Sequence, residues 1–205
     1  PWAPDLPQKV LRTQSCLLID SGLTMVDWAI ALSQVQYRGL IHAVSRRGLW
    51  PQPHARFAGV AFSLRTAGAV PRVRDWLHQI RRFIRTGRCD WRAVIDALRP
   101  SNQVLWQCLS HPERRRFLSH LRPYWDCHRH RIAPVISARL NALIESGQLV
   151  CHVGRIRELR DEGVDVEVVI RERGNAATSL FRVGAVLNCS GSESDYRKLD
   201  SPLVQ

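Results

Sequence analysis

The sequence predicts an α/β fold with a central parallel sheet, a helical insertion and a β-hairpin or meander, and three observations support this prediction. First, residues 16–44 run from a short apolar strand through a helical segment to a second apolar strand. Second, apolar side chains recur at helical spacing over residues 72–146. Third, strand-like runs return over residues 149–188. The first segment has the form of a βαβ unit, whose two strands should be parallel.

The βαβ unit is delimited by its apolar runs and turn signals. Residues 16–20 are expected to form the first strand and residues 40–44 the second. Between them, the apolar positions from Leu23 onward keep the spacing of a helix, and Gly39 is a natural C-terminal cap for it. Residues 1–14 are rich in proline and polar side chains, which indicates a linker or an edge segment.

The helical insertion, about residues 72–146, contains recognisable start and stop signals. Asp90 is a natural N-cap. Ser110 and Glu113 have the spacing of a capping box, in which each side chain bonds the other residue's amide. Gly147 is expected to end the last helix. We interpret the apolar stripes of these helices as packing surfaces rather than as cofactor sites.

The chain then returns to β structure, with strands expected over residues 149–153, 156–159, 164–172 and 181–188. A turn at residues 161–163 separates the second from the third. We therefore predict a single domain over residues 1–205, with Rossmann-like parts at about 15–50 and 148–191 around the helical insertion.

The turn after the first strand, within SCLLIDSGLTMVD, resembles a dinucleotide-binding turn with one of its three glycines. Gly22 stands where the second glycine lets the backbone approach a pyrophosphate, and Ser21, Leu23 and Thr24 flank it. Asp20 and Met25 replace the first and third glycines. A plain βα unit without a ligand, with Asp20 serving as a helix cap, is the alternative interpretation of this turn.

The second strand is followed by Ser45, Arg46 and Arg47, where a dinucleotide fold holds the adenosine ribose. A site specific for NAD has an acidic residue here, whereas guanidinium groups can bind a 2′-phosphate through two charged hydrogen bonds. The position therefore favours NADP(H) over NAD(H). The alternative is a pair of solvated surface arginines in a basic protein.

Residues 124–131, YWDCHRHR, gather aromatic, acidic and basic side chains in one short stretch. His128 and His130 would diverge on a helix, and no third ligand is apparent, so we predict no metal site. A histidine here could act as an acid or base, with Asp126 orienting it. We favour a structural role, as a polar network that ties the insertion to a neighbouring domain.

Composition limits the remaining function classes. The net charge of +12 suits an anionic ligand or an acidic partner surface. Because the basic residues are spread along the chain, we do not expect nucleic-acid binding. The apolar runs are too short to cross a membrane, and the six scattered cysteines indicate reduced thiols, so we expect a cytoplasmic protein.

Several stretches together resemble the FAD-NAD(P)-binding family of bacterial flavoprotein oxidoreductases. The stretches are LLIDSGLTMVD (17–27), IHAVSRRGLWPQPH (41–54), WRAVIDALRP (91–100), RRRFLSHLRPYWDCHRHRIAP (114–134) and LNCSGSESDYRKLDSPLV (187–204). The resemblance implies an inserted NAD(P)-binding domain, part of a larger flavoprotein whose flavin-binding remainder lies before residue 1 and after residue 205. It also implies that FAD is bound in the full-length protein only, and that this fragment alone is not an active enzyme.

Carried over to this sequence, the resemblance implies that Ser21, Gly22 and Leu23 contact the pyrophosphate. It implies that Ser45, Arg46 and Arg47 lie near the adenosine end, and that Gly191 lies close to the cofactor. The family has glycine where this chain has Asp20. The main hypothesis is an NADP(H)-binding domain that presents nicotinamide for hydride transfer to flavin. The alternative is a degenerate, non-catalytic Rossmann domain that acts as a protein-interaction module.

Overall fold

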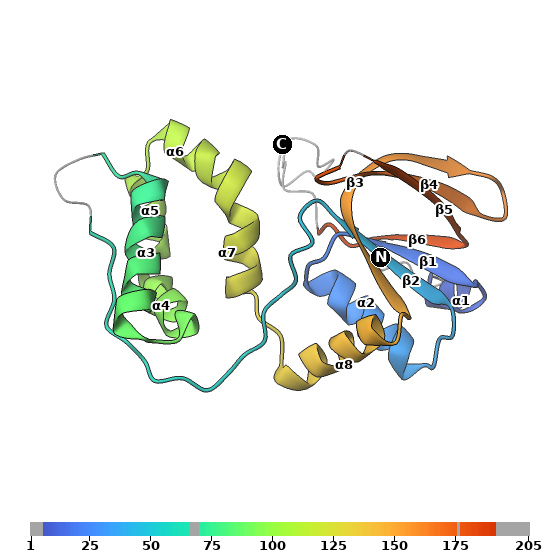
Figure 1. Ribbon diagram of the computed structural model, residues 1–205, viewed down its shortest axis with the longest axis horizontal. Helices are drawn as coiled ribbons and strands as arrows, with labels where there is room; N and C mark the ends of the chain where they lie inside the picture. Colours follow the sequence, from blue (N-terminus) through green and yellow to red (C-terminus); the bar gives the residue numbers. More distant parts are fainter. Residues whose placement is uncertain (1–5, 66–69, 176, 192–205) are drawn as a thin grey trace, which may run out of the picture. The chain divides into compact units, whose positions relative to one another are not determined.

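A computed structural model describes residues 6–65, 70–175 and 177–191, and the chain divides into two compact units (Figure 1). The sheet unit comprises residues 1–48 and 138–205, and the helical unit comprises residues 49–137. The hypothesis of a single domain with an insertion stays a prediction. Residues 1–5 of the expected linker and residues 192–204 of the last family-like stretch lie outside the described residues.

The sheet unit is built on one sheet with the strand order β5-β4-β3-β2-β1-β6. The pairs β1–β2, β1–β6 and β2–β3 are parallel, whereas β3–β4 and β4–β5 are antiparallel. The strands are β1 (Ser15–Ile19), β2 (Leu40–Ser45), β3 (Leu149–Asp161), β4 (Val166–Glu172), β5 (Thr178–Val183) and β6 (Ala185–Asn188). The predicted α/β fold, with a central parallel sheet and a meander, is confirmed.

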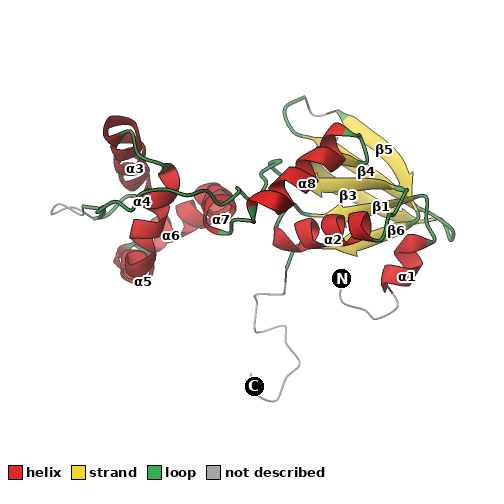
Figure 2. Ribbon diagram, turned by 90° about the horizontal axis from the view of Figure 1, so that it is seen from below, coloured by secondary structure: helices red, strands yellow, loops and turns green. Residues whose placement is uncertain are grey.

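The two faces of the parallel strands pack against different layers, because alternate side chains of a strand point to opposite sides. Helices α2 (Leu23–Gln34) and α8 (Pro134–Glu145) lie along one face (Figure 2). On the other face, Leu17 of β1 and Val44 of β2 form a buried cluster with Val168, Ile170 and Val183 of the meander. The meander therefore curls over the parallel strands and closes the core.

Four local predictions for the sheet unit were wrong. The single strand expected over residues 181–188 is two strands, β5 and β6, which lie at opposite edges of the sheet. The expected strands at 156–159 and 149–153 are one strand, β3, whose register shifts between Ile156 and Glu158. Gly39 does not cap α2, which ends at Gln34; instead it is buried, and a Cβ there would lie against Tyr37 and the Gln14 carbonyl oxygen. Residues Leu6–Leu11 form a short helix, α1, rather than a linker.

The helical unit contains α3 (Val73–Gly87), α4 (Trp91–Leu98), α5 (Asn102–Cys108), α6 (His111–Arg116) and α7 (Arg122–Arg129), with a π-helical segment, η2 (Phe117–Leu121), before α7. The N-cap predicted at Asp90 is confirmed, since its carboxylate accepts a 2.7 Å hydrogen bond from the amide of Arg92. Gly147, with a φ of +75°, follows α8 as expected.

The predicted capping box of α6 is wrong. Ser110 occupies the N-cap position, but its side chain makes no capping hydrogen bond. The carboxylate of Glu113 is instead buried, accepts a 2.8 Å hydrogen bond from the amide of Val73 and pairs with Arg116. Glu113 thus satisfies the first amide of α3, which is distant in sequence but lies within hydrogen-bonding distance in the fold.

No helix in the described part of the chain is long and apolar enough to span a membrane. The cytoplasmic location expected from composition stays a prediction.

Candidate functional site

The carboxyl ends of β1, β2 and β6 meet at one edge of the sheet. In the parallel register, Ile19 lies opposite both Val44 and Asn188. The turns that follow are joined to this edge, since the amide of Asp20 donates to Val44 (2.8 Å) and the amide of Cys189 donates to Ile19 (3.0 Å). The three segments predicted as a site, residues 21–24, 45–47 and Gly191, therefore lie at the same edge. This is the edge at which open α/β sheets bind ligands.

The N-terminus of α2 opens at this edge without a side-chain cap. Gly22 is the N-cap residue, with extended backbone angles (φ −80°, ψ −169°), and it offers the first turn no side-chain cap. The first helical hydrogen bond runs from the amide of Val26 to the carbonyl of Gly22 (3.2 Å). The first turn itself contains no acidic residue, and the positive end of the helix dipole favours an anion.

Nothing among the described residues requires glycine at position 22. Its φ is negative, and a Cβ added there would meet only the Asp20 Oδ2 atom, at an ordinary contact distance of 3.8 Å. A glycine whose own fold leaves room for a side chain fits a position where a ligand approaches the backbone. Ser21 beside it is buried, Leu23 is exposed and Thr24 is half-buried.

Asp20 occupies a backbone conformation that favours glycine. Its φ is +90°, in the region where a Cβ crowds the following carbonyl. The position therefore keeps the tight turn of the fingerprint's first glycine, although the residue has changed. The same side chain carries its carboxylate to the N-terminus of α2, as the 3.8 Å distance to a Gly22 Cβ shows. Met25, at the third glycine position, is fully buried in the core.

The turn after β2 is shaped by Ser45 and Gly48. The Ser45 hydroxyl oxygen accepts a 3.0 Å hydrogen bond from the amide of Gly48, and this bond closes the turn that carries Arg46 and Arg47. Arg46 is exposed and Arg47 is half-buried. Gly48 has a φ of +62°, and a Cβ on it would lie 2.6 Å from Val153 Cγ2. The Ser45 side chain therefore stabilises the turn itself.

We expect the substitution Gly48→Ala to destabilise the protein by about 2 kcal/mol, since it adds both backbone strain and a clash with Val153. Gly163→Ala is the matched control, because Gly163 also has a positive φ (+85°) but has nothing within 4 Å of an added Cβ. Urea unfolding of both variants measures the difference. An equal effect of the two substitutions would show that Val153 can move aside.

The turn after β6 is held by Asn188. Its side-chain oxygen accepts hydrogen bonds from the amide (3.1 Å) and the hydroxyl (2.7 Å) of Ser190. Gly191 follows, exposed, with a φ of +90°. A small turn ending in an exposed glycine thus lies beside the turn after β1, on the strand that neighbours β1.

A pair of histidines on the meander-covered face was missed by sequence reasoning. His42 Nδ1 lies 2.9 Å from His152 Nε2, and both rings stack on Phe181, with ring centroids 4.3 and 4.8 Å from its own. Burial lowers the pKa of His42 to about 4 and also lowers that of His152. In the sequence, each histidine lies within a short apolar run, IHAV (41–44) or VCHV (150–153). Only the register of β2 and β3 brings the two runs together.

All six cysteines are free thiols, as expected. Burial raises the pKa of Cys16 to about 12 and that of Cys189, near the candidate site, to about 11. These thiols are therefore protonated at neutral pH and act as small apolar side chains rather than as nucleophiles.

The Tyr124–Arg131 cluster makes contacts within the helical unit. Arg131, whose side chain is 3% exposed, pairs with Asp96 of α4 at 2.5 Å, and the ring of His128 packs edge-on against Trp91 of α4. Asp126 pairs with Arg122 within α7 (3.3 Å). The described residues contain no group of three side chains suited to hold a metal ion. The cluster fastens α7 to α4, and its role toward another domain stays a prediction.

Comparison with known proteins shows a likeness of fold. No family model matches the chain, and no curated protein matches it significantly. The chain is similar to the solved ornithine hydroxylase from Pseudomonas aeruginosa (TM-score 0.56, 14% identity, 94% of this chain and 39% of that one). It is also similar to L-lysine 6-monooxygenase from Pseudomonas syringae (0.53, 14%, 90% and 36%). A third is the cadaverine monooxygenase from Erwinia amylovora, bound to FAD (0.52, 8%, 89% and 36%).

The chain spans little more than a third of the length of these enzymes. At such low identities the likeness concerns the fold alone. The likeness extends over both units of the present chain.

Proposed function

We propose that the chain is the NADP(H)-binding domain of a flavin-dependent oxidoreductase, a member of the FAD-NAD(P)-binding family. In the whole protein it would present the nicotinamide for hydride transfer to a flavin held by flanking segments. The observation that carries the proposal is the uncapped N-terminus of α2 at the same sheet edge as the turn of Arg46 and Arg47. The fold likeness to monooxygenases, one of them bound to FAD, supports the flavoprotein context.

The residues at the edge suit the parts of the cofactor. The amides at the start of α2, from Gly22 to Thr24, would hold the pyrophosphate, because they are donors at the positive end of a helix. Arg46 and Arg47 would hold the 2′-phosphate, and the turn at Gly191 would lie against the rest of the dinucleotide. The bound cofactor supplies a hydride, and the protein's part is to bind and orient it.

The direct test is a calorimetric titration of the 205-residue chain with NADPH and, separately, with NADH. We expect saturable binding of NADPH at micromolar to millimolar concentration and weaker binding of NADH. Absence of any heat or tryptophan fluorescence change at millimolar NADPH would contradict the proposal.

We expect Arg46→Gln and Arg47→Gln each to weaken NADPH binding about tenfold, because each removes a charged donor from the 2′-phosphate. NADH binding should change little, since NADH lacks this phosphate. Arg38→Gln is the matched control: Arg38 is exposed at the opposite, N-terminal end of β2 and carries the same charge. An equal loss for both cofactors would show a general charge effect instead of recognition of the 2′-phosphate.

The second candidate is a degenerate Rossmann domain that acts as an interaction module. One observation favours it: the carboxylate of Asp20 lies at the N-terminus of α2, where a pyrophosphate would need to bind. Replacing Asp20 separates the two functions. If the Asp20 carboxylate weakens cofactor binding, its removal should raise the affinity for NADPH. If the domain is an interaction module, the affinity for NADPH should not change.

A further inference from the structure

The excess positive charge of the protein is concentrated in the helical unit. Residues 49–137 contain sixteen arginines, no lysine and five acidic residues, a net charge of +11 out of +12 for the whole chain. The basic residues themselves are spread along the chain, as expected, and the net charge differs between the units because most acidic residues lie outside the helical unit. An anionic partner would be attracted to this unit rather than to the sheet unit.

The helical unit also contains an apolar pocket of about 610 Å³, lined by residues of α3, α4, α5, η2 and α7. Its walls include four tryptophans and aliphatic side chains of α3, among them Trp76, Trp91, Trp106, Trp125, Leu77 and Ile80. Figure 1 shows α3 and α7 on opposite sides of this unit. Leu77, Ile80 and Ile84 remain half-exposed, so the unit's own helices leave this surface incompletely covered. Apolar side chains from outside would be stabilised there.

The cations beside the pocket are not neutralised by the protein. Arg81 of α3 and Arg129 of α7 line the pocket, and neither forms an ion pair with a residue of the described ranges. By contrast, Arg92, Arg116 and Arg131 are paired with carboxylates of the unit. The pocket thus combines an apolar interior with cations free to meet an acidic group.

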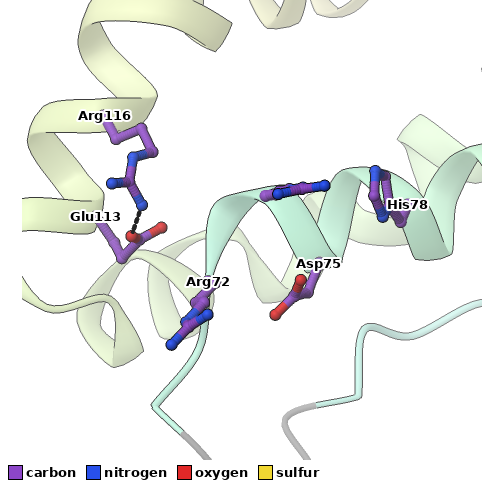
Figure 3. A pocket seen from close by; sticks show the side chains of 6 residues that line it. Arg72, Asp75, His78, Glu113 and Arg116 are labelled. Atoms are coloured by element: carbon purple, nitrogen blue, oxygen red, sulfur yellow. Dashed lines mark hydrogen bonds and ion pairs between the residues drawn. The ribbon is translucent and has the colours of Figure 1, made fainter.

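A second cavity, lined mainly by charged side chains, lies around the start of α3 (Figure 3). It has a volume of about 700 Å³ and is lined by Arg72, Arg74, Asp75, His78, Glu113 and Arg116. Glu113 is directed to Arg116 and to the amide of Val73, so its charge is already engaged. Only Asp75 then offsets the remaining arginines of this cavity. Helix α3 therefore carries positive charge both beside the apolar pocket, at Arg81, and around its N-terminus, at Arg72 and Arg74.

We propose that the helical unit docks an acidic amphipathic segment of a partner protein, whose apolar side chains fill the pocket of α3 and α7 while its carboxylates meet Arg81 and Arg129. Leucine-like side chains match the aliphatic walls, as in other grooves that bind amphipathic helices. The positive charges beside the pocket favour a partner segment that carries negative charge. Nucleic acid fits less well, because bases stack on open aromatic faces along a phosphate track rather than fill an aliphatic pocket. The residues that line this pocket belong to the helical unit, whereas the residues of the proposed NADP(H) site belong to the sheet unit.

The test is a fluorescence anisotropy titration of the full chain with a labelled peptide of about 16 residues, which has leucine at i, i+3, i+4 and i+7 and glutamate elsewhere. We expect saturable binding that quenches or shifts tryptophan emission and weakens with salt. The double substitution Arg81→Gln/Arg129→Gln should weaken it about tenfold. The double substitution Arg82→Gln/Arg85→Gln is the matched control, since both arginines are on α3 but do not line the pocket.

A substitution inside the pocket, Ile80→Asp, should abolish binding of the peptide, and circular dichroism would check that the helices persist. The proposal is overturned if a scrambled peptide of the same composition binds equally, or if both double variants lose the same affinity. It is also overturned if a uridine oligonucleotide displaces the peptide and binds more tightly, or if sedimentation shows a dimer that Ile80→Asp dissociates. Because NADPH titration reports on the sheet unit, a failure here leaves the proposed cofactor site standing.

Discussion

Replacing Asp20 by glycine is expected to raise the affinity for NADPH by about tenfold or more and to stabilise the fold by about 1 kcal/mol. The affinity rises because a carboxylate is removed from the N-terminus of α2, where the cofactor's pyrophosphate would lie. The stability rises because glycine adopts the observed φ of +90° without the crowding that a Cβ causes. Calorimetric titration and urea unfolding of the same preparation measure both effects.

The variant Asp20→Asn separates charge from strain. Asparagine removes the negative charge but keeps a Cβ, so most of the gain in affinity should appear without the gain in stability. Asp27→Asn, at an exposed position on α2, is the control for a change in net charge alone. If Asp20→Gly stabilises the protein and yet NADPH affinity does not change, the interaction-module hypothesis is favoured and the cofactor proposal is lost.

Acidification from pH 7 to pH 4 is expected to remove about 2 kcal/mol of unfolding free energy through the buried His42. Burial lowers the pKa of His42 from 6.5 to about 4 in the fold. Between these values the unfolded chain binds a proton that the folded chain does not, so the unfolding free energy falls as the pH falls. A proton on both rings would also oppose the 2.9 Å contact between His42 Nδ1 and His152 Nε2.

The variant His42→Phe keeps a ring that can stack on Phe181 but cannot titrate, so its stability should depend less on pH between 7 and 4. His54→Gln is the control, because His54 is exposed and its loss should leave the profile unchanged. Urea unfolding at several pH values gives the comparison. If the parent and His42→Phe lose stability equally on acidification, another group must cause the dependence.

Much of the fold could be predicted from local patterns. The apolar runs of β1 and β2, the helical spacing from Leu23 and the cap at Asp90 depend on residues close in the chain, and the structure confirms them. Gly39 and Ser110 matched equally good local signals but were misassigned. Gly39 is required by the close approach of Tyr37, and the partner expected for Ser110, Glu113, is engaged by Val73. Both local signals failed because the folded chain places other groups against these residues.

The candidate site was likewise predictable only in part from the sequence. The sequence by itself determined which residues follow the strands: Gly22 after β1, Arg46 and Arg47 after β2, and Gly191 after β6. Only the tertiary structure decided that Asp20 takes a glycine-like conformation, that His42 meets His152, and that the net charge gathers in one unit with an apolar pocket. The reason is physical: strand order, register and curl bring distant residues together, and these depend on the packing of the whole chain rather than on neighbouring residues.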